Sequence, residues 1–97
     1  MTIYALSSGP GISGIAVIRV SGKETTEVIK KITGAILPLP RVATLTKFSK
    51  NGGKELIDEG VIIWFPAPNS YSGEDLAEFH VHGGRAIINA MHSAIGK

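Results

Sequence analysis

Three side chains that could bind a ligand recur at every second position near the C-terminal end of the chain: Glu78, His80 and His82. On a regular strand this spacing puts all three on one face. Two imidazoles and a carboxylate suit zinc or iron, but same-face neighbours on one strand rarely converge on a single ion, so no metal site is expected. We expect instead a polar pocket wall in which Glu78 accepts hydrogen bonds from a ligand, or a histidine that tethers the turn at Gly83 and Gly84.

Arg19 is the other binding candidate, because it interrupts the otherwise apolar run of residues 15–20. A guanidinium in that position must find an anion or several acceptors, since burying it unpaired is too costly. The alternative is that Arg19 lies on an exposed face or in a structural ion pair. We assign no catalytic residue, and the absence of cysteine excludes a thiolate nucleophile and a zinc-thiolate site.

The glycine-rich segment of residues 9–14 has the spacing of a dinucleotide-binding motif. That motif works by placing a pyrophosphate at a helix N-terminus. Here the β-branched run of residues 15–20 predicts that a strand follows, so we interpret the segment as a tight connection near a ligand or partner. The chain has no P-loop pattern, so it is not expected to bind GTP.

Aromatic residues flank the proline-rich loop of residues 66–73: Trp64 and Phe65 precede it and Tyr71 lies within it. They could pack on a flat heterocycle. Aromatic residues beside prolines are more often core or loop anchors, so we assign none of them to a site.

Hydrophobic periodicity and turn residues divide the chain into strands and helices. Ser21 and Glu24 have the spacing of a capping box, which predicts a helix over about residues 22–33 that ends before Gly34. The order of the elements predicts an α+β domain with two helices packed on a mixed β-sheet. The expected strands cover residues 2–6, 15–20, 42–48, 57–65 and 75–82, with a hairpin turn at 51–53, and the second helix carries Ile87, Ile88, Met91 and Ile95.

Composition limits the structural classes to which the protein can belong. The chain has 97 residues, of which 43% are hydrophobic, and a net charge of +2, which is typical of one small globular domain. Lysines and arginines are dispersed, so the isoelectric point of 9.1 is weak evidence for nucleic acid binding. No apolar stretch approaches the ~20 residues of a membrane-spanning helix, and the N-terminus has no signal-peptide pattern. We therefore expect a cytoplasmic protein without membrane contact.

Three stretches resemble, in order and spacing, the N-terminal domain of the tRNA modification GTPase family called MnmE or TrmE. They are residues 15–22 (IAVIRVSG), 65–75 (FPAPNSYSGED) and 78–84 (EFHVHGG). The middle stretch is the most specific, because it is a long uninterrupted match in a loop. Residues 37–41 and 57–60 also fit, so the resemblance covers essentially the whole chain.

This resemblance implies that residues 1–97 form a tetrahydrofolate-binding and dimerisation domain. The implied fold is similar to the folate-binding part of the glycine-cleavage aminomethyltransferases, and the implied cofactor is a 5-formyltetrahydrofolate-type one-carbon carrier. The folate-contacting arginine and glutamate of the family correspond to Arg19 and Glu78. Glu78 would then accept hydrogen bonds from the donor edge of the pterin.

The resemblance also implies partners outside these residues. In the family, the full-length protein acts as a homodimer with an MnmG/GidA-type flavoprotein on carbon 5 of the wobble uridine of tRNA, and its GTPase domain binds GTP, Mg and K. The helical and GTPase domains are absent from this chain, which by itself is not expected to be catalytic. Ile12 stands where the family usually has an arginine, and the family domain continues past Lys97, so the folate site is expected to lack the contacts made there.

Two other functions stay open. The chain could act only as a homodimerisation module, with the glycine-rich segment and the first strands at the interface. It could also be a small RNA-binding domain, as suggested by its isoelectric point and by the tRNA substrate of the family. That function would show a steep salt dependence, because phosphate neutralisation releases counterions.

Overall fold

The computed structural model describes residues 3–6, 14–34, 37–68 and 73–96. Most of the glycine-rich segment and Tyr71 therefore lie outside the described residues. Within them, β2 begins directly after Gly14, so a strand follows the glycine-rich segment as the sequence predicts. The elements in chain order are β1 (Ile3–Leu6), β2 (Ile15–Ser21), α1 (Thr25–Thr33), β3 (Thr44–Lys50), β4 (Glu55–Phe65), β5 (Leu76–His82) and α2 (Arg85–Ile95).

The strands form one five-stranded sheet in the order β1-β2-β5-β4-β3. The α+β class with two helices is confirmed, but all four strand pairings are antiparallel, where a mixed sheet was expected. The connection through α1 carries the chain from β2 to the far edge of the sheet and not to the neighbouring position. β5 then enters between β2 and β4 and runs antiparallel to both, so no parallel neighbours arise.

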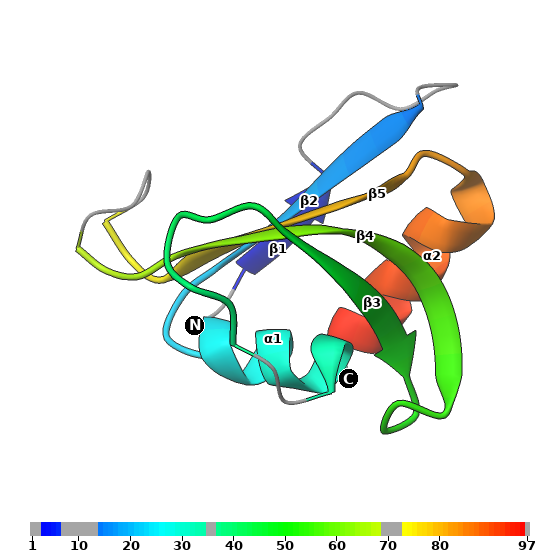
Figure 1. Ribbon diagram of the computed structural model, residues 1–97, viewed down its shortest axis with the longest axis horizontal. Helices are drawn as coiled ribbons and strands as arrows, with labels where there is room; N and C mark the ends of the chain where they lie inside the picture. Colours follow the sequence, from blue (N-terminus) through cyan, green and yellow to red (C-terminus); the bar gives the residue numbers. More distant parts are fainter. Residues whose placement is uncertain (1–2, 7–13, 35–36, 69–72, 97) are drawn as a thin grey trace.

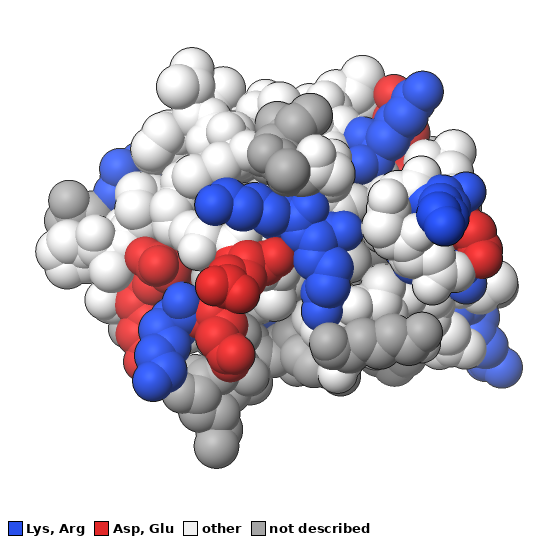
Figure 2. Space-filling view, turned by 90° about the horizontal axis from the view of Figure 1, so that it is seen from below, with Lys and Arg blue, Asp and Glu red and all other residues white. Residues whose placement is uncertain are grey.

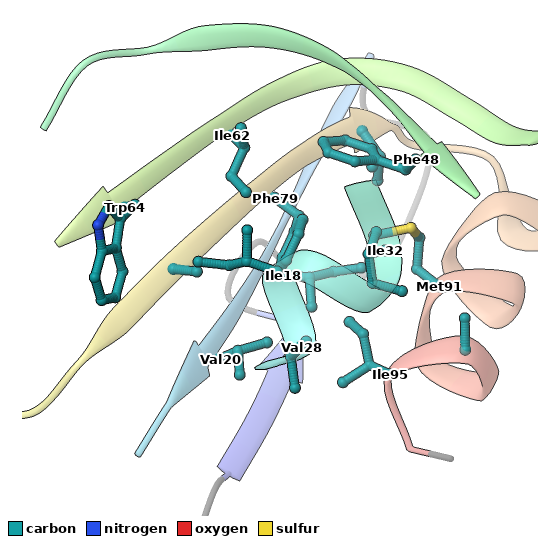
Figure 3. Packing of buried hydrophobic residues seen from close by; sticks show 14 of the residues in the cluster. Ile18, Val20, Val28, Ile32, Phe48, Ile62, Trp64, Phe79, Met91 and Ile95 are labelled. Atoms are coloured by element: carbon teal, nitrogen blue, oxygen red, sulfur yellow. The ribbon is translucent and has the colours of Figure 1, made fainter. Parts of the chain in front are cut away.

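Both helices lie on one face of the sheet (Figure 1), and no described helix lies on the other. Alternation along β2 points Ala16, Ile18 and Val20 toward the helices, where all three are buried. The hydrophobic core therefore lies between the sheet and the two helices (Figure 3). The largest fully buried side chains are Phe48, Phe79, Ile18, Ile29, Ile32, Ile62 and Met91.

The predicted start of α1 is wrong by three residues, because the helix begins at Thr25 and has no side-chain cap. Ser21 is the last residue of β2, where it pairs with Leu76 and so is not available as an N-cap. Gly22, with φ of 131°, turns the chain, and its carbonyl accepts a hydrogen bond from the Thr25 hydroxyl at 2.7 Å. Strand pairing, which depends on a distant segment, thus overrides the local capping signal.

The end of α1 and the β3–β4 hairpin agree with the sequence. Gly34 closes α1 in the left-handed region with φ of 80°, and its N–H donates to the Lys30 carbonyl. The hairpin turns at residues 51–53, all of which have positive φ. None of the described helices is long and apolar enough to cross a membrane.

Candidate functional site

Arg19 and Glu78 lie directly opposite each other on β2 and β5, on the sheet face away from the helices. Their chain neighbours Ile18, Val20 and Phe79 are fully buried in the core, so alternation along each strand turns Arg19 and Glu78 the other way. The sequence marked both residues as binding candidates, and the structure brings them together.

We call this side of the sheet the open face. His80 lies on it two residues after Glu78. β4 lies on the other side of β5, and Val61 pairs with His80 while Ile63 pairs with Glu78. Because directly paired residues share a face, these two apolar side chains flank the polar ones. Val17 of β2 pairs with His80 from the opposite side.

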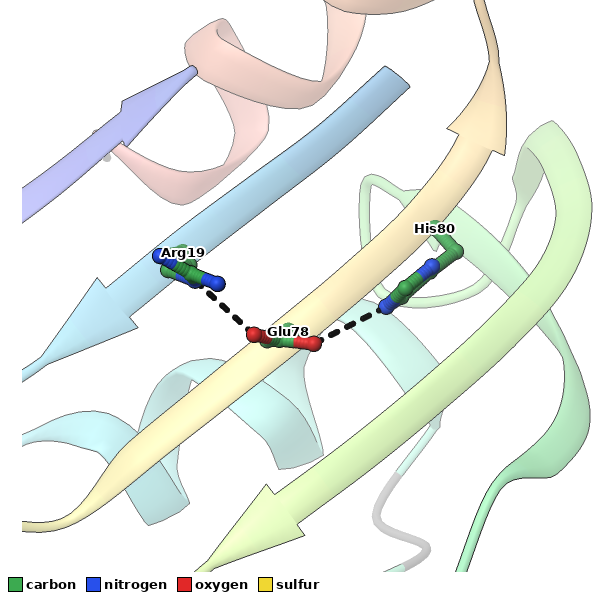
Figure 4. Close-up of polar contacts among 3 residues, drawn as sticks. All are labelled: Arg19, Glu78 and His80. Carbon is green, nitrogen blue, oxygen red and sulfur yellow. Dashed lines mark hydrogen bonds and ion pairs between the residues drawn. The ribbon is translucent and has the colours of Figure 1, made fainter. Parts of the chain in front are cut away.

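Glu78 contacts two donors (Figure 4). Its Oε2 accepts a hydrogen bond from Nε of Arg19 at 2.8 Å, and its Oε1 lies 3.0 Å from Nε2 of His80. The Glu78 side chain is 14% exposed, whereas those of Arg19 and His80 are 44% and 28% exposed. The carboxylate is thus largely withdrawn from bulk water, while both of its partners reach the surface.

Glu78 is ionised at neutral pH. Burial raises the pKa of Glu78, but hydrogen bonds from His80 and Arg19, together with the positive charge of Arg19, outweigh it and hold the pKa below the ordinary value of 4.5. An ionised carboxylate can only accept hydrogen bonds, so Nε2 of His80 carries the hydrogen of their contact. The site therefore offers a fixed anionic acceptor beside a guanidinium.

His82 shares the open face but does not join this group. Its backbone N–H donates to Asp58 Oδ2 at 2.8 Å, and its ring Nδ1 lies 2.9 Å from Asp58 Oδ1. Burial raises the pKa of Asp58, but these hydrogen bonds and one from the Glu59 backbone lower it below its ordinary value of 3.8. Among the residues that the structure describes, no three histidine or acidic side chains are grouped to hold a metal ion.

Sequence reasoning missed Asp58. The predicted β4 began at residue 57, and an acid inside it carried no distinct signal. One weak signal was available, because Asp58 and Glu59 are acids in a strand whose other residues at 57–65 are apolar or glycine, and a buried acid needs a donor. The donor itself lies 24 residues away, so only the folded chain identifies it.

A depression of about 340 Å³ lies on the open face, and of the Arg19–Glu78–His80 group it is His80 that lines it. Its walls are mainly apolar, with polar side chains from β4 and β5. Trp64 lies on the helical side with 6% exposure and belongs to the core, so it is not available to stack on a ligand here. The residues that line the depression include Ile15, Val61, Ile63, Glu59, His80 and His82.

The face that carries the helices shows both signs of charge (Figure 2). Acidic side chains gather at one end of it around a basic one, basic side chains lie toward its middle, and both signs occur at the other end. Along α1, Glu27 lies in the first turn and Lys30 and Lys31 in the last, so each sign of charge lies at the helix end whose dipole favours it. This face has no continuous basic stripe of the kind that tracks a phosphate backbone.

The family model described as GTP-binding protein TrmE N-terminus matches residues 2–97. The chain belongs to the TrmE N-terminal family. It is 65% identical over 97 residues to the tRNA modification GTPase MnmE of Pelagibacter ubique, across 100% of this chain and 22% of that protein. These matches confirm the family that residues 15–22, 65–75 and 78–84 indicated.

Other relatives are also much longer than this chain. A mitochondrial 5-taurinomethyluridine-tRNA synthase subunit of Danio rerio is 50% identical over 95 residues, which are 98% of this chain and 19% of that protein. The MnmE of Paramagnetospirillum magneticum is 46% identical over 96 residues, across 99% of this chain and 22% of that protein. This TrmE N-terminal chain thus spans about a fifth of the length of the curated relatives it matches.

Proposed function

We propose that this TrmE N-terminal chain, residues 1–97, binds a 5-formyltetrahydrofolate-type one-carbon cofactor on its open face, with Arg19 and Glu78 as the contacting residues. The observation that carries the proposal is the contact of Glu78 with Arg19 at 2.8 Å and with His80 at 3.0 Å, where His80 lines an apolar depression of about 340 Å³. An apolar pocket with a few convergent polar groups is the usual form of a small-molecule site.

The chemistry of the site matches the chemistry of a reduced pterin. The pterin presents an edge of N–H donors, and Glu78 is an acceptor whose low pKa keeps it ionised at neutral pH. The flat ring and the aryl group that follows it are apolar on their faces and suit walls such as Val61 and Ile63. Arg19 is exposed enough, at 44%, to reach acceptor groups of the ligand as well as Glu78.

The parent protein supplies the biological setting of this proposal. Relatives are named tRNA modification GTPases, and we propose the same parent activity here, directed at carbon 5 of the wobble uridine of tRNA. GTP, Mg and K would bind a GTPase domain outside residues 1–97, and an MnmG/GidA-type flavoprotein would be the partner. In this setting the chain is a cytoplasmic cofactor-binding domain without a catalytic residue of its own, related in fold to the aminomethyltransferases.

We also propose that the chain forms a homodimer. Several large apolar side chains are exposed, among them Leu39 at 72%, Leu45 at 69% and Ile15 at 53%. Association with a second copy would remove such surface from water. Analytical ultracentrifugation at tens of micromolar tests this point, and a strictly monomeric chain at that concentration would contradict it.

Isothermal titration calorimetry with 5-formyltetrahydrofolate tests the binding site. The wild-type chain is expected to bind, and Glu78→Gln and Arg19→Ala are each expected to lose at least tenfold in affinity, roughly the 1.4 kcal/mol of one charged hydrogen bond. Glu55→Gln is the matched control, because Glu55 also pairs with a basic side chain, Lys50 at 3.6 Å, on the neighbouring strand. Absence of binding by the wild-type chain, or unchanged affinity in both site variants, would refute the assignment.

A further inference from the structure

His80 has a place in the site that the sequence left open. Glu78 has two carboxylate oxygens, and the structure gives each of them a different donor: Arg19 on Oε2 at 2.8 Å and His80 on Oε1 at 3.0 Å. The two donors lie on opposite sides of the carboxylate (Figure 4). Such an arrangement restrains the rotation of the carboxylate about its last side-chain bond.

That restraint matters because the last torsion of a glutamate is broad and only weakly preferred by itself. A single donor on one oxygen fixes one point of the group and leaves its plane free to turn. A second donor on the other oxygen fixes the plane. Each oxygen then keeps a remaining acceptor position with a defined direction that a ligand can use.

We propose that His80 is a positioning residue that orients the Glu78 carboxylate for ligand binding. The inference rests on the proposed function, because it concerns the same site and the same cofactor class. His80 also lines the depression, and the role inferred for it is the one it exerts through Glu78.

The neighbours of the pair support a specific role. The side chains paired across the strands from His80 are Val17 and Val61, and the one paired with Glu78 on β4 is Ile63. None of these three offers a competing side-chain hydrogen bond. The titratable and charged groups that contact the Glu78 carboxylate are therefore Arg19 from β2 and His80 from β5 itself.

His82 shows that the position on the strand alone does not produce this role. It lies two residues further along the same face, yet its ring and its backbone N–H are engaged by Asp58. His82 is therefore the matched control for the effect of His80 on the Glu78 carboxylate. Both are histidines on one face of β5, and only one of them contacts Glu78.

The decisive experiment compares His80→Ala, His80→Gln and His82→Ala. Glutamine places an amide N–H at the reach of Nε2, so it can restore the hydrogen bond to Glu78, whereas alanine cannot. We expect His80→Ala to weaken binding of 5-formyltetrahydrofolate about tenfold and His80→Gln to recover most of the affinity. His82 also lines the depression, so His82→Ala serves as the control for the titration of Glu78 and not for the affinity.

A second readout needs no ligand. In the carboxyl carbon NMR titration of Glu78, His80→Ala is expected to raise the Glu78 pKa, because His80 provides a hydrogen bond and a charge that lower it. His80→Gln is expected to reverse part of that rise, since it restores the hydrogen bond but not the charge. Thermal unfolding of each variant checks that the fold is retained.

The two readouts separate failure of this inference from failure of the proposed function. If the wild-type chain does not bind the cofactor, the Glu78 titration still shows whether His80 controls the carboxylate. An unchanged Glu78 pKa in His80→Ala would overturn the positioning role. Equal losses of affinity in His80→Ala and His80→Gln, or an equal shift of the Glu78 pKa in His82→Ala, would also overturn it.

Discussion

The Cα of Gly60 lies against the backbone carbonyl of His80, so close that a Cβ on residue 60 would overlap the carbonyl oxygen. β4 and β5 approach closely at this point, one residue before Val61 pairs with His80. The glycine therefore permits the strand pairing that forms the floor of the candidate site.

Gly60→Ala is accordingly expected to destabilise the domain by about 1–3 kcal/mol or more, because the clash is with backbone and a side-chain rotation cannot relieve it. Urea unfolding measures this loss. Gly14→Ala is the control, since nothing lies within 4 Å of its added Cβ. Equal stability of the two variants would contradict the close approach at Gly60.

Filling the depression is expected to block cofactor binding without unfolding the protein. Val61→Trp places a large ring on the open face, where Val61 lines the depression, and it leaves the buried core on the helical face untouched. Calorimetry with 5-formyltetrahydrofolate should then show no binding, while circular dichroism stays that of the wild type. Leu56→Trp, at a 62% exposed position of β4 that does not line the depression, should bind normally. Wild-type affinity in Val61→Trp would place the ligand elsewhere.

Asp58 is expected to contribute more to stability than its partner His82. Asp58→Ala removes the acceptor of both the backbone and the ring hydrogen bonds and should cost about 1–3 kcal/mol, since hydrogen bonds to charged groups are the stronger ones. His82→Ala keeps the backbone bond and loses only a 67% exposed ring, for which a cost below about 1 kcal/mol is expected. Thermal unfolding of both variants measures the difference, and the reverse order of stability would contradict this assignment.

The domain is expected to lose stability in acid through Glu78 and Asp58. Both have folded-state pKa values below their ordinary values of 4.5 and 3.8. Each therefore contributes stability that is fully present above its ordinary pKa and is lost as the pH falls through the lower folded-state pKa. Urea unfolding from pH 7 down to about pH 2.5 should show a decline that begins below about pH 5.

The double variant Glu78→Gln, Asp58→Asn identifies the source of that decline. It should be less stable than the wild type at pH 7, and the difference should shrink as the pH falls, because both proteins then lack the two ionised carboxylates. Glu55→Gln, at an exposed position, should follow the wild-type curve. A double variant with the full wild-type decline would assign the acid sensitivity to other groups.

Local sequence patterns predicted helix ends and turns correctly where the backbone conformation depends on neighbouring residues alone. The hairpin turn at residues 51–53 and the helix end at Gly34 both need positive φ, and glycine or asparagine occupies each of these positions. The predicted start of α1 was wrong because Ser21 is the last paired residue of β2 and so does not cap the helix. The prediction of a mixed sheet was wrong because the relative direction of the strands depends on the sheet position that the chain reaches after the connection through α1.

The sequence by itself determined that Glu78, His80 and His82 share one face, because strand alternation is local and needs no partner. It also marked Arg19 as a residue that needs an anion or several acceptors unless it lies on an exposed face. Only the tertiary structure decided that Arg19 meets Glu78, 59 residues away, and that His82 turns to Asp58. The register of two distant strands is set by the packing of all the side chains they bury together. That packing depends on residues far apart in the chain, so a local sequence pattern does not predict it.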